Sequence, residues 1–289
     1  MKHPLPSIAP HAPPHGLQFD LQALREQLRR RQMLRWLAAA GAVPLVGTGC
    51  GGGGDASSAS STTTLSSTGT TTTAGAGACS AVPEETAGPY PGDGSNGANA
   101  LSLSGIVRSD IRSSFNGASA TAAGVPLSLT ITLANSNSSS CGALSGYAIY
   151  LWHCDRDGKY SLYSSGVTGE NYLRGVQATD SAGQVSFQTI FPGCYDGRVP
   201  HMHFEVYRST TTATSYANKL RTSQLAFPRD ICSTIYTNAS GYGSSLTNLN
   251  RTTFSSDTVF SDGTSLQMTS LSGSVAAGFT GSITVAIAA

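Results

Sequence analysis

The sequence has little charge: only 11% of its 289 residues are Asp, Glu, Lys or Arg, against about 25% in an average soluble domain. Residues 51–289 hold 11 Lys/Arg and 14 Asp/Glu, so this part of the chain is slightly acidic. A protein that binds nucleic acid needs a basic face to neutralise phosphates. We therefore expect no nucleic-acid partner.

Amphipathic helical periodicity is nearly absent after residue 40, and only the first 50 residues favour a helix. Short segments that alternate apolar and polar residues take its place, and the best of them is Leu127–Leu133. Further strands are expected at Leu101–Ile111, Tyr147–His153, Gly183–Ile190, Met202–Tyr207, Gln224–Phe227 and Ile283–Ile287. Many short strands separated by turns predict an all-β fold, a β-sandwich formed by residues 79–289.

The chain also lacks an apolar run long enough to span a bilayer. The basic block Arg29–Arg35 has a twin-arginine look, and the apolar run Trp36–Val46 that follows has the length of a signal-peptide core. We interpret residues 1–50 as a signal segment for export. The alternative is a basic amphipathic helix of a cytoplasmic protein.

Residues 47–78 predict how an exported domain would be attached. Gly47-Thr48-Gly49-Cys50 resembles a bacterial lipobox with Cys50 as the acylated residue, although Gly47 stands where that pattern usually has Leu. Residues 51–78 are almost entirely Gly, Ser, Thr and Ala, which predicts a flexible linker. We expect a periplasmic or cell-envelope lipoprotein that touches a membrane only through Cys50. Plain cleavage near Cys50 is the alternative.

No two cysteines have the Cys-x-x-Cys spacing, which argues against a zinc ribbon. If Cys50 is lipidated, five cysteines remain, and export permits disulfides. Two disulfides and one free thiol are then expected, although the sequence does not give the pairing. The five are Cys79, Cys141, Cys154, Cys194 and Cys232.

Histidine is scarce, and only His153, His201 and His203 lie beyond residue 50. Residues two apart in a strand point to the same face, so His201 and His203 can bind one ion. The alternative is a pair of polar residues on a solvent-facing strand, which the flanking Pro200 and Phe204 make less attractive.

Two tyrosines that follow glycine turns, Tyr160 and Tyr195, add to this pair of histidines. A phenol with a pKa of about 10 is normally neutral, but a hard trivalent cation would deprotonate it. Two phenolates and two neutral imidazoles suit Fe(III) better than zinc or copper. A copper site remains an alternative, as does an ordinary half-buried aromatic for either tyrosine alone.

These motifs resemble those of the intradiol ring-cleavage dioxygenases, which include catechol 1,2-dioxygenases and protocatechuate 3,4-dioxygenases. The segment Trp152–Ser161 is similar to the first iron-tyrosine motif of that family, and Thr189–Tyr195 with the following His201–Phe204 is similar to the second. Further matches are Glu85–Tyr90, Gly105–Arg112 and Leu173–Gln177. The matches run in the family's order from about residue 80 to residue 230.

The resemblance implies one non-haem Fe(III) per chain, bound by four side chains. Tyr195 matches the family's axial tyrosine, which leaves the iron when substrate binds, and Tyr160 matches the equatorial tyrosine, which stays. His201 and His203 complete the ligand set. His153, on the strand that leads to Tyr160, is expected to be structural.

The resemblance also implies residues around the substrate. Arg198 matches an arginine beside the substrate ring, and Gln224 matches a glutamine near the substrate and the oxygen site. Tyr90 is expected at the mouth of the pocket.

The implied activity is cleavage of a catechol-type ring by O2 between its two hydroxyl-bearing carbons, giving a muconate-type diacid. The alternative is a membrane-tethered β-sandwich surface or binding module with a structural or inactive metal site. Catechol-specific members of the family carry a helical dimerisation segment, and none is visible before Cys79. The chain looks more like the secreted branch, and homo-oligomerisation stays open.

Overall fold

This computed structural model describes residues 80–289. The expected signal segment, the candidate acylation site Cys50, the linker up to residue 78 and Cys79 lie outside the described residues. Within the part that is described, no helix is both long and apolar enough to cross a membrane.

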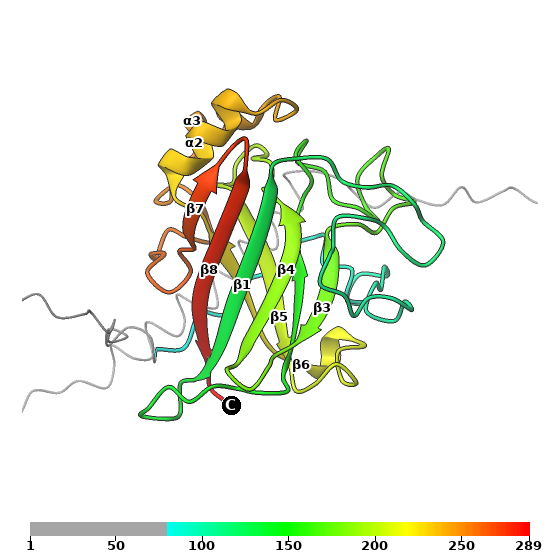
Figure 1. Ribbon diagram of the computed structural model, residues 1–289, viewed down its shortest axis with the longest axis vertical. Coiled ribbons are helices and arrows are strands. Elements are labelled where there is room, and N and C mark those ends of the chain that lie inside the picture. The colour runs from blue at the N-terminus through cyan, green and yellow to red at the C-terminus, as the bar shows by residue number, and fades with distance from the viewer. Residues whose placement is uncertain (1–79) are drawn as a thin grey trace, which may run out of the picture.

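Two four-stranded sheets face each other (Figure 1). The first has the order β4-β1-β8-β7 and the second the order β3-β2-β5-β6. The first sheet consists of β1 (Pro126–Asn135), β4 (Gln184–Ile190), β7 (Ser270–Ser274) and β8 (Gly278–Ile287). The second consists of β2 (Ala148–Trp152), β3 (Arg174–Ala178), β5 (His201–Tyr207) and β6 (Lys219–Ala226). The predicted all-β sandwich is confirmed.

Alternation along the strands separates the core from the candidate site. In β1, every second residue from Leu127 to Leu133 is buried in the main apolar cluster. In β5, Met202, Phe204 and Val206 belong to that same cluster. The intervening residues, from His201 to Tyr207, therefore point to the other face of the second sheet.

That other face is covered by the chain that precedes β1. The backbone N–H of Glu85 donates to the carbonyl of Thr222 on β6, at 2.9 Å. The Tyr150 hydroxyl on β2 donates to the Pro91 carbonyl at 2.7 Å. Every residue of β5 is consequently buried, including its polar ones.

The expectation of a helix only in the first 50 residues is wrong. The described residues contain the 3-10 turn η1 (Tyr216–Asn218) and two α-helices, α2 (Arg229–Asn238) and α3 (Ser245–Arg251). Helix α2 buries Cys232, Ile235 and Tyr236. Ile235 and Tyr236 come three and four residues after Cys232, so all three lie on one face of the helix. Its remaining positions are mostly Ser, Thr and Asn, so packing against the core, rather than helix propensity, stabilises it.

The expected strand at Leu101–Ile111 is also wrong. This segment contains turns, and Gly105 has a φ of +93°. The Arg108 N–H donates to the Val176 carbonyl of β3, and the Ile111 N–H donates to the Gln188 carbonyl of β4. The segment passes from the edge of one sheet to the edge of the other and forms only isolated bridges. Its buried residues are Leu101, Ile106 and Ile111, five residues apart, so the alternation in the sequence does not become alternating burial.

The cysteine expectation needs correction as well. Cys154, Cys194 and Cys232 are free and buried, whereas Cys141 is disulfide-bonded. With three of the five cysteines free, at most one disulfide remains among them, not two. All three thiols lie in apolar clusters, where cysteine behaves as a small hydrophobic residue.

Candidate active site

Two turns bring the candidate tyrosines together. In the first turn, the Asp155 carboxylate accepts hydrogen bonds from the N–H groups of Asp157 and Lys159, which shapes the loop before Tyr160. In the second turn, the N–H of Gly193 donates to the Asp155 carbonyl at 3.0 Å. The two turns therefore pack backbone against backbone, and each carries one tyrosine.

Glycines make this close approach feasible. A Cβ at Gly193 would lie 2.6 Å from the Arg156 carbonyl oxygen. Gly158 has a φ of +78°, and a Cβ there would lie 3.1 Å from the Cβ of Tyr195. The glycines that precede the two tyrosines are thus part of how the site is built.

The two histidines lie where the strand argument places them. His203 on β5 is paired with Trp152 on β2 and with Gln224 on β6. The Trp152 ring stacks on the His203 ring, with centroids 5.0 Å apart and planes 10° apart. His201 and His203 are both nearly inaccessible to solvent.

Four polar atoms from these elements converge. The Nε2 atoms of His201 and His203 are 3.1 Å apart, and the Tyr195 hydroxyl lies 3.1 Å from His201 Nε2. The Tyr160 hydroxyl lies 3.2 Å from His203 Nε2 and 3.5 Å from His201 Nε2. All four residues expected as metal ligands thus come together, although their sequence positions span more than 40 residues.

Burial keeps three groups of this cluster, the two imidazoles and the Tyr160 phenol, uncharged. Burial lowers the pKa of His201 and of His203 well below the usual value, and the positive charge of Arg198 lowers both further. Burial also raises the pKa of the Tyr160 phenol well above 10, and the neighbouring Tyr195 adds to that effect. Without a cation, therefore, neutral imidazoles face a protonated Tyr160 phenol.

The donor set fits a metal ion. His201 Nδ1 lies 2.7 Å from the Val199 carbonyl, which only accepts hydrogen bonds, so Nδ1 carries the proton and Nε2 offers its lone pair to the cluster. Ligands bonded to one ion at about 2.1 Å and at right angles lie about 3 Å apart, close to the separations found here. Within residues 80–289 no group of three or more His, Cys, Asp or Glu is placed to hold a metal. This cluster differs because half of its donors are phenols.

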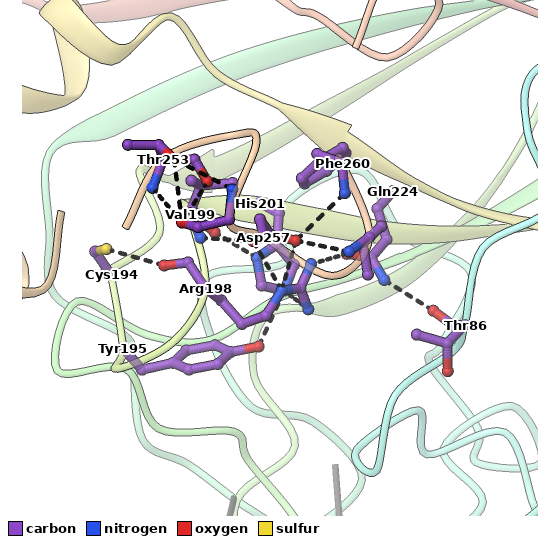
Figure 2. A network of polar contacts seen from close by, with 12 residues as sticks. Thr86, Cys194, Tyr195, Arg198, Val199, His201, Gln224, Thr253, Asp257 and Phe260 are labelled. Atoms are coloured by element: carbon purple, nitrogen blue, oxygen red, sulfur yellow. Dashed lines mark hydrogen bonds and ion pairs between the residues drawn. The ribbon is translucent and has the colours of Figure 1, made fainter. Parts of the chain in front are cut away.

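Arg198 borders the cluster and is held on two sides (Figure 2). Its Nε donates to the Asp257 carboxylate at 3.0 Å, and its Nη2 donates to Gln224 Oε1 at 2.7 Å. Its Nη1 lies 3.4 Å from His201 Nε2. Burial lowers the pKa of Arg198, but the facing Tyr195 and Asp257 outweigh it, so the pKa lies above its usual value.

Gln224 and Tyr90 both lie beside the cluster. Gln224 uses both ends of its amide, because its Nε2 donates to the Thr86 carbonyl while its Oε1 accepts from Arg198. The Tyr90 ring lies 4.9 Å from the Tyr160 ring, and Arg174 holds the Tyr90 carbonyl. Tyr90 therefore lies next to a candidate metal ligand.

His153 lies outside the four-atom cluster. Its Nε2 is 2.7 Å from the Thr189 hydroxyl and its Nδ1 is 2.8 Å from the Cys154 carbonyl. Both ring nitrogens are thus engaged within the protein, as expected of a structural histidine.

Two residues of the site were missed at the level of sequence. Asp257 directly follows the mostly polar stretch Thr252–Ser256, with no motif around it. Arg174 belongs to a matched segment but received no role, although it is 1% exposed and donates to the carbonyls of Tyr90, Pro91 and Ser161. The one signal for it in the sequence is that the matched segment Leu173–Gln177 contains an arginine but no acidic residue to pair with it.

Comparisons with known proteins agree with this geometry. A family model described as "Dioxygenase" matches residues 114–232. An intradiol ring-cleavage dioxygenase from Tetranychus urticae has a similar fold, with a TM-score of 0.51 and 24% identity, covering 63% of this chain and 86% of that one. A second dioxygenase crystal structure has a TM-score of 0.50 and 25% identity over the same shares of the two chains. A sequence search among curated proteins finds no significant match.

The sandwich and the matched region define a dioxygenase, an oxidoreductase. More narrowly, its motifs resemble those of the intradiol ring-cleavage dioxygenases, and a solved member of that family has a similar fold. The family resemblance inferred from the tyrosine and histidine motifs is confirmed.

Proposed function

We propose that the protein uses one non-haem Fe(III) to cleave a catechol with O2 between the two hydroxyl-bearing carbons, which yields a muconate-type diacid. The observation that carries this proposal is the convergence of two phenol oxygens and two imidazole nitrogens within 3.1–3.5 Å. In this proposal Tyr160, Tyr195, His201 and His203 are the ligands.

The ion would supply Lewis-acid chemistry and a template for the two catechol oxygens. The imidazoles contribute neutral donors, because burial keeps their pKa values low. With two phenolates, the four ligands leave a net charge of +1 on a ferric site, which favours a catechol bound as a dianion.

The two tyrosines differ in freedom, and this difference supports separate roles. Tyr160 is 1% exposed, its N–H donates to Ser164 Oγ, and its ring packs against Tyr90. Tyr195 is only partly buried and stands at the start of the turn that leads to Arg198. We infer that the Tyr195 oxygen accepts a proton from the substrate and moves away, while Tyr160 stays in place.

Arg198 would stabilise negative charge that develops on the ring. Its guanidinium is fixed before the substrate arrives, and preorganised charge of this kind contributes strongly to catalysis. Tyr90, beside Tyr160, would line the pocket, and Gln224 would act through Arg198.

Purified protein tests the proposal directly. Phenolate coordination to ferric iron predicts a wine-red colour with a broad visible band, a shift of that band on adding catechol, and oxygen uptake with formation of a ring-opened diacid. Metal analysis should find about one iron per chain. Protein that stays colourless after iron loading, or that binds copper in preference, would refute the proposal.

We further propose that the domain is exported and attached to the cell envelope through Cys50. The basic block, the apolar run and the linker composition support this proposal.

A further inference from the structure

Part of the candidate site comes from a segment that the family model does not cover. The matched region ends at residue 232, whereas Asp257 lies on the loop that follows α3. We propose that Asp257 is a positioning residue, which fixes the guanidinium of Arg198 so that one edge faces the four-atom cluster. This inference rests on the proposed function, because it gives Arg198 a task at the same site.

The Asp257 carboxylate is fully buried and rigidly held. Its side chain has no exposed surface, and both of its oxygens lie within 3.2 Å of Arg198 Nε. Three backbone N–H groups also donate to it: Val199 at 2.8 Å, Val259 at 2.9 Å and Phe260 at 3.3 Å. The carboxylate is therefore fixed by the main chain before it contacts Arg198.

This carboxylate determines which part of Arg198 is left for the site. A guanidinium has five N–H donors in a planar fork. Asp257 takes Nε and Gln224 takes Nη2, so Nη1 is the nitrogen that remains beside His201 Nε2 (Figure 2). Because Asp257 and Gln224 lie on different elements, their two contacts prevent the Arg198 guanidinium from rotating.

The same contact balances a buried charge. Arg198 is only 12% exposed, and Asp257 is the carboxylate with which it forms a salt bridge. Removing one partner of a buried pair leaves an uncompensated charge, which costs far more than a surface ion pair. Neutralising Asp257 should therefore displace the Arg198 side chain towards water and away from the cluster.

A double-mutant cycle tests the inference. The variants are Asp257→Asn, Arg198→Gln and the combination of the two, prepared in the iron-loaded full chain. The readouts are the affinity for 4-nitrocatechol, followed by its absorbance, and kcat for ring cleavage. Asp257→Asn alone should reduce both about 10- to 100-fold. In the Arg198→Gln background it should change them by less than about twofold, because the residue through which it acts is already gone.

The matched control is Asp262→Asn, the same charge change at an exposed position of the same stretch, which should leave both readouts unchanged. Equal losses from Asp257→Asn in the two backgrounds would overturn the inference, because they would show that Asp257 only supports the loop. Wild-type values in Asp257→Asn would overturn it too.

The proposed function can fail separately. If wild type binds 4-nitrocatechol without cleaving any catechol, the proposed activity falls, and the cycle still decides the role of Asp257 through affinity. If wild type does not bind the probe at all, both proposals fall.

Discussion

At the scale of single residues, removing the hydroxyl of Tyr160 tests whether this residue is a metal ligand or only a buried aromatic. Tyr160→Phe keeps the ring that packs against Tyr90 and removes only the oxygen near the two histidines. We expect the visible band to change and ring cleavage to fall by about 100-fold or more, with little change in Tm. Absorption spectra, oxygen uptake and thermal unfolding measure these effects.

Tyr216→Phe is the matched control, because Tyr216 is 44% exposed and lies on η1. It should keep the spectrum and the activity of the wild type. Unchanged oxygen uptake in Tyr160→Phe would refute the role of Tyr160 as a ligand.

Because His153 is buried, we expect the stability of the folded protein to depend on pH. Burial lowers the pKa of His153 to about 4, against about 6.5 in an unfolded chain. Between these values the unfolded state binds the proton and the folded state does not, so the stabilisation is complete above pH 6.5 and is lost as the pH falls towards 4. The loss amounts to roughly 3 kcal/mol over that range.

His153→Gln cannot bind this proton and should show a smaller loss of stability on acidification. Urea unfolding at pH 7.5 and at pH 5.0 measures the difference between the two proteins. The same slope in both would contradict a neutral, buried His153.

At the scale of elements, the pairing of the two tyrosine turns depends on Gly193. In Gly193→Ala, the new methyl group would meet backbone atoms of Asp155 and Arg156 at 2.6–2.9 Å, and backbone cannot rotate away as a side chain can. We expect a loss of about 1–3 kcal/mol in stability, from overpacking, and weaker retention of iron. Chemical unfolding and iron content after dialysis measure both.

Gly169→Ala serves as the control, since nothing lies within 4 Å of the methyl group that it adds. It should behave as wild type. Full retention of iron in Gly193→Ala would show that the two turns are not coupled.

The elements also show which parts of the fold can be predicted from the sequence. Period-two alternation predicts β1, β2, β4 and β5 because each buries at least one face against the core. The same rule fails at Leu101–Ile111, where only isolated bridges, at Val107 and Asp110, join the edges of the two sheets. It also missed α2, whose stability comes from tertiary packing that no local pattern reports.

The site was predictable to the extent that it is local. The His-x-His pair shares a face by strand geometry alone, and the family motifs name both tyrosines. Asp257 reaches Arg198 only through the return of a distant loop, 59 residues along the chain. Long-range contacts of this kind depend on the fold as a whole.

At the scale of the whole molecule, segments on both sides of the matched region complete the site. Thr86 holds Gln224 from the N-terminal side, and Asp257 holds Arg198 from the C-terminal side. Residues 114–232 alone would lack both anchors. The functional unit is therefore larger than the matched region.

The proposed attachment of this unit to the cell envelope depends on a single thiol. An acyl group on Cys50 would hold the domain at a membrane, with residues 51–78 as the spacer. We expect wild type to be recovered in the membrane fraction and to incorporate a palmitate analogue, and Cys50→Ser to be soluble and unlabelled with the same specific activity. Cys232→Ser, which changes a buried thiol in α2, should remain labelled. Soluble, unlabelled wild-type protein would favour plain cleavage near Cys50, because recovery in the membrane fraction depends on the Cys50 sulfur only if that sulfur is acylated.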